Sequence, residues 1–253
     1  MSITLTRSEW QKAVRPADRT VIAIGDVHGQ AHLLEALHAA LRDDIDRLGV
    51  PATVIHLGDL VDRGTRNRDC VDLARAGLAG DGIELVTLRG NHEDMLLDTL
   101  LERRVYGSGV WEWNGGALVR AELGAPGSLA ELRWAFGHDR LAWLARLPRS
   151  HRVGELLFVH AGIRPGVPLA RQRPEDLIWI REEFLSHEGE WPENVAVVHG
   201  HTPGPLEVGP HRIGIDTGAY ATGVLTAVEF AGERMRFVSL EGTPDTEAFG
   251  GIG

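Results

Sequence analysis

Five short runs of apolar, mostly β-branched residues limit the fold of this chain more than any other feature. They are TVIAIGD (Thr20–Asp26), ATVIHLGD (Ala52–Asp59), GIELVTLRGNHE (Gly82–Glu93), ELLFVHAG (Glu155–Gly162) and VAVVHGH (Val195–His201). The apolar part of each run is continuous rather than alternating, which is typical of strands that are covered on both faces. We therefore expect a sheet that lies between other layers.

Helical patterns separate the first three runs. Leucine and isoleucine recur at three- and four-residue steps from Gln30 to Leu48, and Gly49 and Pro51 end this pattern. Weaker helical patterns cover Arg68–Ala79 and Glu93–Arg104. The order strand, helix, strand, helix, strand predicts parallel pairing and an α/β layered domain.

The rest of the chain carries three weaker patterns. Residues 106–152 look helical and contain four tryptophans, which we expect to pack between helices: Trp111, Trp113, Trp134 and Trp143. Residues 211–230 and 234–241 predict antiparallel strands with glycine turns. We expect one domain over residues 1–253, with a core at about 20–240 and a loose tail at 242–253.

Composition narrows the range of partners. The formal net charge of the 253-residue chain is -10, which argues against a broad nucleic-acid surface because such a surface needs clustered Lys and Arg. Cys70 is the single cysteine, so an internal disulfide is excluded. The start of the chain has no apolar signal-like stretch, and no apolar run approaches the ~18 residues of a membrane span. We expect a cytoplasmic protein with no membrane or nucleic-acid partner.

Polar side chains follow every one of the five predicted strands. In chain order they are Asp26 and His28, then Asp59, Asp62 and Arg63, then Asn91 and His92, then His160, then His199 and His201. One such residue is usually a turn or cap residue, but the carboxyl ends of parallel strands are where α/β sheets bind ligands. Asp, His and Asn donors suit divalent Mn, Fe, Zn or Ni, and the lack of cysteine ligands argues against a structural zinc site.

The motifs GDVHG, GDLVDRG, GNHE, VHAG and GHTP, in this order, resemble the PPP family of phosphoprotein phosphatases within the calcineurin-like metallophosphoesterases. The resemblance spans roughly Val21 to Thr226 and is greatest to small bacterial and bacteriophage serine/threonine phosphatases, which share endings like IDTGAYATG (Ile215–Gly223). It implies two mixed β-sheets packed face to face and flanked by helices. It also implies a metal-dependent serine/threonine phosphomonoesterase.

Position by position, the resemblance implies a site for two divalent ions, with Mn in first place and Fe, Zn or Ni as alternatives. Asp26 and His28 would hold one ion, Asn91, His160 and His201 the other, and Asp59 would bridge both. A metal-bridging hydroxide would attack phosphorus in line. Arg63 and Arg181 would bind the phosphate together with Asn91, and His92, held by Asp62, would protonate the leaving group.

Several alternatives stay open at this stage. The substrate would be a phosphoprotein or phosphopeptide, or else a dinucleoside polyphosphate or another small phosphoester. A third hypothesis is that the protein is not an enzyme but a non-catalytic metal-binding scaffold. The oligomeric state is not predicted. Arg181 could be a helix-surface charge. Arg89 and Glu93 are expected either to form a structural ion pair or to support the metal ligands from outside. His199 is expected either to pack in the core or to support the ligands in the same way, and the turn at Asn114–Gly116 could border the cleft. His56 and Cys70 are expected to be structural.

Overall fold

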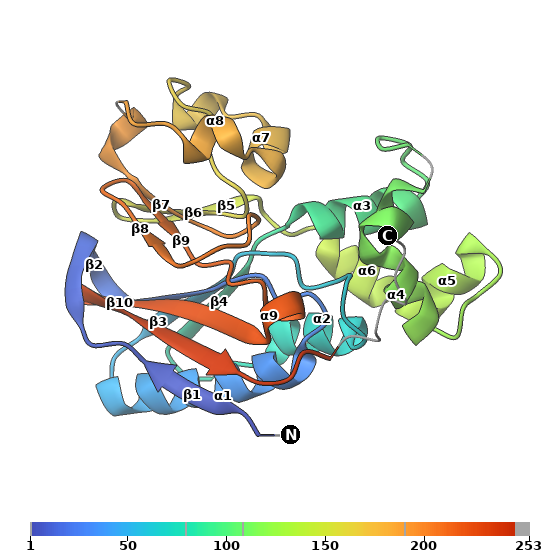
Figure 1. The fold of residues 1–253 in the computed structure, drawn as a ribbon, viewed down its shortest axis with the longest axis horizontal. Coiled ribbons are helices and arrows are strands. Elements are labelled where there is room, and N and C mark those ends of the chain that lie inside the picture. The colour runs from blue at the N-terminus through green and yellow to red at the C-terminus, as the bar shows by residue number, and fades with distance from the viewer. Residues whose placement is uncertain (1, 79, 108, 190, 246–253) are drawn as a thin grey trace.

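The computed structural model describes residues 2–245 except 79, 108 and 190, and its strands form two sheets that lie face to face (Figure 1). The first sheet has the order β1 (Thr4–Arg7), β10 (Val224–Glu241), β2 (Gln11–Ile24), β3 (Ala52–His56), β4 (Ile83–Thr87). The second has the order β5 (Ser150–Val153), β6 (Leu156–Val159), β7 (Ala196–His199), β9 (Arg212–Gly214), β8 (Glu207–Val208). Strands β2, β3 and β4 are parallel, as are β6, β7 and β9, and the other pairs are antiparallel. The predicted α/β fold with two mixed sheets is confirmed.

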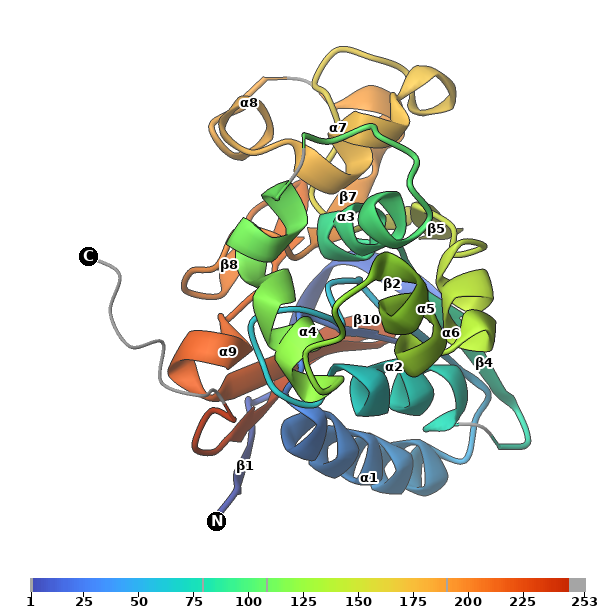
Figure 2. The same ribbon diagram turned by 90° about the vertical axis from the view of Figure 1, so that its right-hand side faces the viewer.

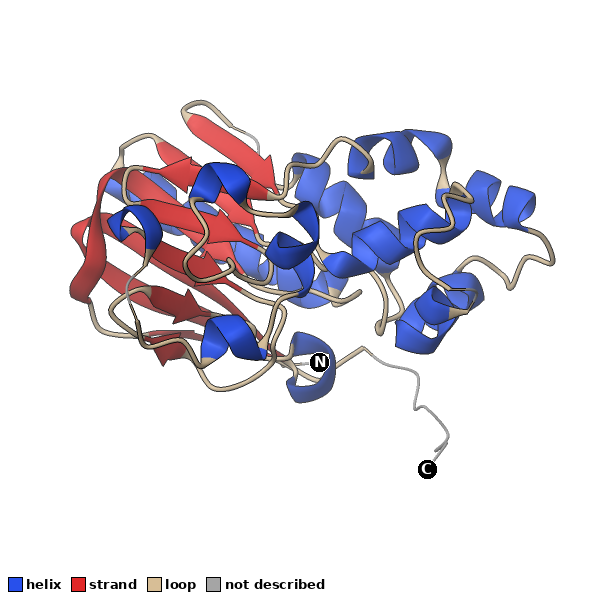
Figure 3. Cartoon of the chain, turned by 90° about the horizontal axis from the view of Figure 1, so that it is seen from above, coloured by secondary structure: helices blue, strands red, loops and turns tan. Residues whose placement is uncertain are grey.

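Helices flank this pair of sheets. They are α1 (Ala31–Leu48), α2 (Asn67–Ala76), α3 (Asn91–Leu100), the π-helical turn η1 (Glu112–Gly116), α4 (Ala117–Glu122), α5 (Leu129–Phe136), α6 (His138–Leu144), α7 (Pro174–Trp179), α8 (Glu182–Leu185) and α9 (Ala219–Thr222), with 3-10 turns at Leu169–Arg171 and Pro192–Asn194. Figure 1 shows α1 below the first sheet, α2 at the right-hand end of that sheet, and α7 and α8 above the second sheet. Helices α3 to α6 gather at one end of the sheets, where they face the viewer in Figure 2. Seen from above, strands fill one half of the molecule and most helices the other (Figure 3).

The core explains why the predicted strands lack alternation. In β2, Val21 and Ala23 pack in the apolar layer between the two sheets, whereas Ile22 and Ile24 pack in the layer under the helices. Since successive side chains of a strand point to opposite faces, both faces need apolar residues. β4 departs from this expectation, because it is an edge strand and only Thr87 of its five residues is buried.

Several boundaries differ from the sequence prediction. β1 and β5 were not expected, and β2 begins at Gln11 rather than Thr20. Antiparallel strands were predicted over residues 211–230 and 234–241. The structure forms the short β9 and helix α9 in the first range, and one long strand, β10, continues from there through the second. β10 stays continuous because Gly232, at φ +62°, lets it bend with a register shift against β2.

The tryptophan-rich segment fits its predicted role only in part. Trp111 is 1 % exposed and lies in the core, but Trp113 and Trp134 are 86 % and 78 % exposed, so the prediction that they pack between helices is wrong. Trp143 is half-buried beneath the guanidinium of Arg75. Helices in this segment are short and bury one side each, which leaves room for tryptophans on their outer faces.

The end of the described chain stays close to the body of the protein. After β10, the backbone N–H of Gly242 donates to Gly223 O (2.9 Å), and that of Asp245 donates to Gln30 Oε1 (2.6 Å). Residues 246–253 of the predicted tail lie outside the described residues. In the part of the chain that the structure describes, no helix is long and apolar enough to cross a membrane.

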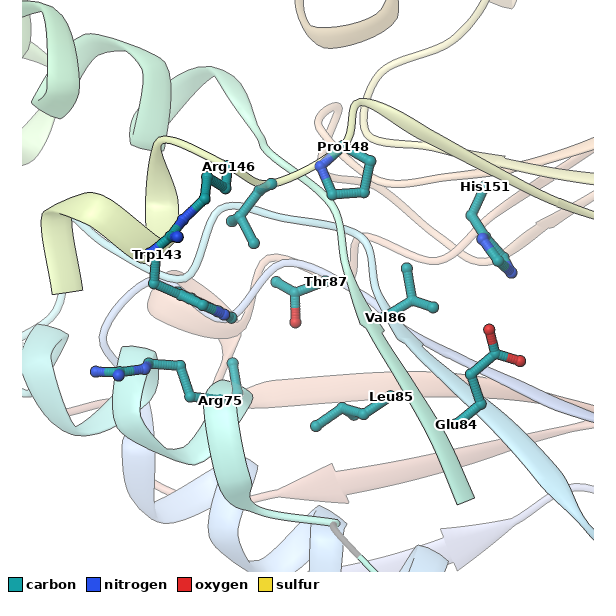
Figure 4. Close-up of a pocket in the computed structure, with 11 residues that line it drawn as sticks. Arg75, Glu84, Leu85, Val86, Thr87, Trp143, Arg146, Pro148 and His151 are labelled. Carbon is teal, nitrogen blue, oxygen red and sulfur yellow. The ribbon is translucent and has the colours of Figure 1, made fainter. Parts of the chain in front are cut away.

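A groove of about 460 Å³ runs beside the outer edge of β4, between α2 and α6 (Figure 4). Arg75, Trp143, Arg146 and His151 line it together with residues 84–87 of the strand. None of the ten residues predicted for the site lines this groove. The predicted chemistry therefore lies elsewhere, at the ends of the strands.

Candidate active site

The segments after β2, β3, β4, β6 and β7 bring nine of the ten predicted residues together at one end of the two sheets, and Arg181 comes from the turn between α7 and α8. Eight of the ten are buried, with at most 3 % of each side chain's surface exposed: Asp26, His28, Asp59, Asp62, Asn91, His92, His160 and His201. Arg63 is half-buried and Arg181 is exposed. Buried charged and polar groups of this density need partners or a bound ion, because burial without compensation is costly.

Asp59 lies at the centre of this cluster. Its Oδ2 is 3.4 Å from His28 Nε2, and its Oδ1 is 3.3 Å from His160 Nε2. Each oxygen of the Asp59 carboxylate thus faces a different histidine. This is the placement expected of a carboxylate that belongs to two neighbouring sets of metal-binding residues.

The backbone fixes which nitrogen of these histidines is free. The Nδ1 of His28 contacts Val61 O at 2.8 Å, and the Nδ1 of His160 contacts Leu57 O at 3.0 Å. A carbonyl oxygen only accepts, so each Nδ1 donates, and in the neutral ring the lone pair is on Nε2. The Nε2 of His160 also meets Asn91 Oδ1 at 2.9 Å. Nitrogen and oxygen lone pairs therefore converge, an arrangement that a cation between them would stabilise.

Two further buried atoms of the described chain lack hydrogen-bond partners and could be satisfied by a bound cation. Among the described residues, neither Asp26 Oδ1 nor His201 Nε2 has a hydrogen-bond partner, although both are buried. Burial and repulsion from Asp216 and Asp59 raise the pKa of Asp26 well above its ordinary value. A divalent cation would relieve this repulsion and satisfy the unpaired atoms.

The donor set fits divalent ions on chemical grounds. Two groups of three buried donors could each hold an ion, His28 with Asp59 and His92, and Asp59 with His160 and His201. The first group contains His92 where the sequence prediction gave Asp26. All the donors are nitrogen or oxygen, which suits borderline and hard divalent metals rather than soft ones.

His92 and Asp62 form a buried pair beside these donors. The Nδ1 of His92 is 2.7 Å from Asp62 Oδ2, and the indole Nε1 of Trp111 donates to Asp62 Oδ1 at 2.8 Å. Burial raises the pKa of Asp62, and the bonds from His92 and Trp111 work against that rise. The carboxylate is therefore held by two nitrogen donors, one on each oxygen.

Arg63 carries a positive charge into the centre. Its Nη1 and Nη2 each lie 3.0 Å from a histidine nitrogen, the Nε2 of His28 and the Nε2 of His92. The guanidinium also stacks at 4.6 Å over the ring of Tyr220. The guanidinium of Arg63 thus lies next to the candidate metal-binding atoms. An anionic group bound there could accept two hydrogen bonds from it.

The backbone of these loops is strained at the site. Ten described residues other than glycine have positive φ, and half of them are predicted site residues: His28, Asp59, Asp62, Arg63 and His201. Such conformations are uncommon and cost on the order of 1–3 kcal/mol each, so they persist where the surroundings enforce them, as at active sites. The loops therefore hold these side chains in fixed orientations at the expense of local backbone strain.

Glu93 supports this arrangement from below. Its carboxylate accepts from the backbone N–H groups of Asp59 (2.9 Å), Leu60 (2.7 Å) and Gly90 (2.8 Å). The expected ion pair between Arg89 and Glu93 does not form, because Arg89 bonds to Asp94 instead. A Cβ at Gly90 would lie 2.1 Å from Asp59 Oδ1, which explains glycine in the GNHE motif.

Other predicted residues have more peripheral places. Arg181 donates to His201 O (3.2 Å) and to Thr202 Oγ1 (2.9 Å), so it binds the loop of a predicted ligand. The ring of His199 packs edge-on against Phe184. The Asn114–Gly116 turn borders the site, since Gly115 O accepts from Arg63 N.

Three residues at the site were given no role there by the sequence reasoning: Trp111, Asp216 and Tyr220. Asp216 is buried and raises the pKa of Asp26, and the ring of Tyr220 lies edge-on to His28 with the ring centroids 5.3 Å apart. Both belong to IDTGAYATG, a motif that was noticed for its resemblance without a role for its side chains. Trp111 had been placed among packing residues, and no sequence signal tied it to Asp62.

Comparison with known proteins agrees with this geometry. A family model described as calcineurin-like phosphoesterase matches residues 19–228. No curated protein matches the chain. One similar solved structure is a "putative diadenosine tetraphosphatase", with TM-score 0.61 and 24% identity over 87% of this chain and 93% of that one. Another is the cold-active protein-tyrosine phosphatase of a psychrophile, Shewanella sp., with TM-score 0.54 and 17% identity over 83% and 77%. At these identities the similarity to the solved structures shows a shared fold.

Proposed function

The chain belongs to the calcineurin-like phosphoesterase family, and we propose that within it this enzyme is a phosphomonoesterase of the PPP serine/threonine phosphatase type. Phosphoester hydrolysis is the chemistry of the family. The observation that carries the narrower proposal is the 2.7 Å hydrogen bond between Asp62 and His92, buried beside Asp59 and Arg63. It gives the site a held proton donor next to an anion-binding arginine.

In this proposal the metal ligands are those of the sequence prediction. Asp26 and His28 would hold one divalent ion, Asn91, His160 and His201 would hold a second, and Asp59 would contribute to both, with Mn in first place. When bound, such ions supply Lewis-acid charge to the phosphoryl oxygens and lower the pKa of the attacking water. The two faces of Asp59 and the unpaired atoms of Asp26 and His201 support this assignment.

Arg63 binds and orients the phosphate. Its two terminal nitrogens point into the centre, where they match two oxygens of a phosphoryl group. Asn91 and Arg181 complete the predicted phosphate site, Arg181 from its position on the His201 loop. Holding the phosphate in one orientation places the leaving oxygen toward His92.

His92 moves the proton. Because its Nδ1 donates to Asp62, the proton that it transfers must be carried on Nε2, which lies 3.9 Å from Asp59 Oδ2. Without a bound phosphate this nitrogen accepts from Arg63 Nη2 at 3.0 Å, so it takes up the proton once the guanidinium has turned to the phosphate. Asp62 keeps the ring in this orientation and stabilises its positive form. A seryl or threonyl alkoxide is a poor leaving group and depends on this proton.

The second candidate is hydrolysis of a dinucleoside polyphosphate, as the description of one similar structure suggests. A nucleotide leaves readily without a strong acid, so the Asp62–His92 pair would add less to that reaction. A phosphotyrosyl substrate lies between these cases, because a phenolate leaves more readily than an alkoxide. The proposed substrate is therefore a phosphoserine or phosphothreonine protein or peptide.

The test is a comparison of kcat/KM for phosphoserine, phosphothreonine and phosphotyrosine peptides and diadenosine tetraphosphate under one metal condition. We expect the phosphoserine and phosphothreonine peptides to be preferred. A tenfold or greater preference for the dinucleotide, about 1.4 kcal/mol in the transition state, would overturn the proposal in favour of the second candidate.

A further inference from the structure

Trp111 occupies an unusual position for a core tryptophan. Its ring is 1 % exposed and packs in the apolar layer that also contains Val119 and Phe136. The indole N–H, however, points out of this layer and donates to Asp62 Oδ1 at 2.8 Å. Trp111 therefore joins the apolar core of the helical segment to the polar centre of the site.

The Asp62 carboxylate is fixed at both of its oxygens. Trp111 donates to Oδ1, and the Nδ1 of His92 lies 2.7 Å from Oδ2. Asp62 has no exposed surface, so water does not replace either donor. Of these two donors, His92 carries the ring that the carboxylate orients, and Trp111 carries an indole that core packing holds in place.

We propose that Trp111 is a positioning residue for the catalytic acid: its indole N–H holds the Asp62 carboxylate so that the other oxygen orients His92. The inference rests on the proposed function, because it concerns the proton delivered to the leaving group. Trp111 touches neither substrate nor metal in this account. It acts through Asp62.

The turn that carries Trp111 is shaped for this contact. A Cβ at Gly116 would lie 2.3 Å from Cε2 of the indole, so the ring rests directly on a glycine backbone. Gly115, at φ +113°, accepts from Arg63 N, and a Cβ there would lie 2.8 Å from that nitrogen. The turn thus contacts both Asp62 and the next residue, Arg63.

A purely structural role for Trp111 predicts different behaviour. Trp111→Phe keeps an aromatic ring in the apolar layer and removes only the donor and part of the ring volume. If packing alone matters, the variant loses stability and its rates fall alike on all substrates. If the hydrogen bond matters, Asp62 Oδ1 is left buried without a partner, and the carboxylate turns or takes up a proton.

The decisive measurement is the dependence of kcat on the leaving group. We expect Trp111→Phe to lose roughly 10–100-fold in kcat on an alkyl phosphate, as for an outer partner of a functional side chain, with little change in KM. The loss on p-nitrophenyl phosphate should be several-fold smaller, because that leaving group needs little protonation. Val119→Ala is the matched control: it removes apolar volume from the same layer and should affect both substrates equally.

A second measurement does not depend on turnover. The indole N–H signal of Trp111, identified by its loss in Trp111→Phe, should shift in the NMR spectrum of Asp62→Asn and stay in place in Val119→Ala. An unmoved signal in Asp62→Asn would overturn the inference, as would an equal loss on both substrates. Wild-type protein that hydrolyses neither phosphomonoester would instead overturn the proposed function, while the NMR shift would still report the contact.

Discussion

Two buried histidine clusters involve β3 or the loop that follows it, and they differ in what surrounds them. At the site, the Nε2 atoms of His28 and His160 converge on Asp59. Near the end of β3, His56 instead meets His38 of α1, with their Nε2 atoms 2.9 Å apart, and Thr87 Oγ1 lies 3.2 Å from His56 Nδ1. Both clusters are buried, so burial alone does not distinguish a functional histidine from a structural one.

The difference lies in charge and in the backbone. Within the described residues, His38 and His56 belong to no group of three donors that could hold an ion. Neither has a positive φ, whereas five site residues do. The structural pair shares a hydrogen between its rings, while the site gathers several carboxylates and histidine lone pairs, among which Asp26 Oδ1 and His201 Nε2 have no hydrogen-bond partner among the described residues. Surplus donors and a strained backbone, taken together, mark the functional cluster.

The largest effect should follow from changing Asp59, where the two sides of the site meet. Asp59→Asn removes the negative charge that faces both histidines. Its loss in kcat/KM on a phosphopeptide should exceed the roughly 10²–10⁴-fold that general acid catalysis by His92 contributes. His38→Leu combined with His56→Leu should leave activity near wild type. Comparable losses in the two proteins would remove the distinction between the clusters.

His92→Ala should have the next largest effect. We expect a loss of roughly 10²–10⁴-fold in turnover on an alkyl phosphate, since general acid catalysis contributes about that much. The loss should be smaller on an aryl phosphate, and the content of bound metal should be unchanged. Because His92 also falls in one of the two metal-capable groups, loss of an ion from this variant would reassign it from acid to ligand.

A smaller effect tests the strained turn beside Arg63. Gly115→Ala places a Cβ at positive φ and 2.8 Å from Arg63 N, so it should raise KM and lower kcat several-fold by moving the guanidinium. Gly109→Ala is the control, because Gly109 also has positive φ but nothing lies within 4 Å of its added Cβ. The strain of about 1 kcal/mol is common to both variants. Equal kinetic losses would show that strain, rather than contact with Arg63, is responsible.

The smallest effect on activity, with a clear effect on stability, concerns the structural pair. Burial lowers the pKa of His38 to about 4 and that of His56 to about 3. Since the unfolded state binds more protons below its pKa of ~6.5, the free energy of unfolding should fall as the pH drops from 6.5 toward 4, by on the order of 1 kcal/mol per pH unit for each histidine. Denaturant melts of wild type and the double leucine variant at pH 7.5 and 5 measure this. A variant with the same pH dependence as wild type would contradict it.

The sequence predicts the strands and the residues that follow them better than the contacts made by more distant segments. Continuous apolar runs predicted β2, β3, β6 and β7 because both of their faces are covered, but β4 is an edge strand and shares the pattern without the burial. Nine of the ten predicted site residues were found because each follows a strand, whereas Arg181, between α7 and α8, was predicted from the family resemblance alone. Trp111, Asp216 and Tyr220 reach the site from other segments, and their contacts depend on how the helices pack against the sheets. Such contacts have no local sequence pattern.

We propose that the strand ends form a site for two divalent ions that share Asp59. The most direct test is to count the Mn²⁺ ions bound per chain at equilibrium, in wild type and in Asp59→Asn, with the His38→Leu, His56→Leu protein as the control. We expect two ions in wild type and in the control and fewer in Asp59→Asn. One ion or none in wild type, or two in Asp59→Asn, would contradict it.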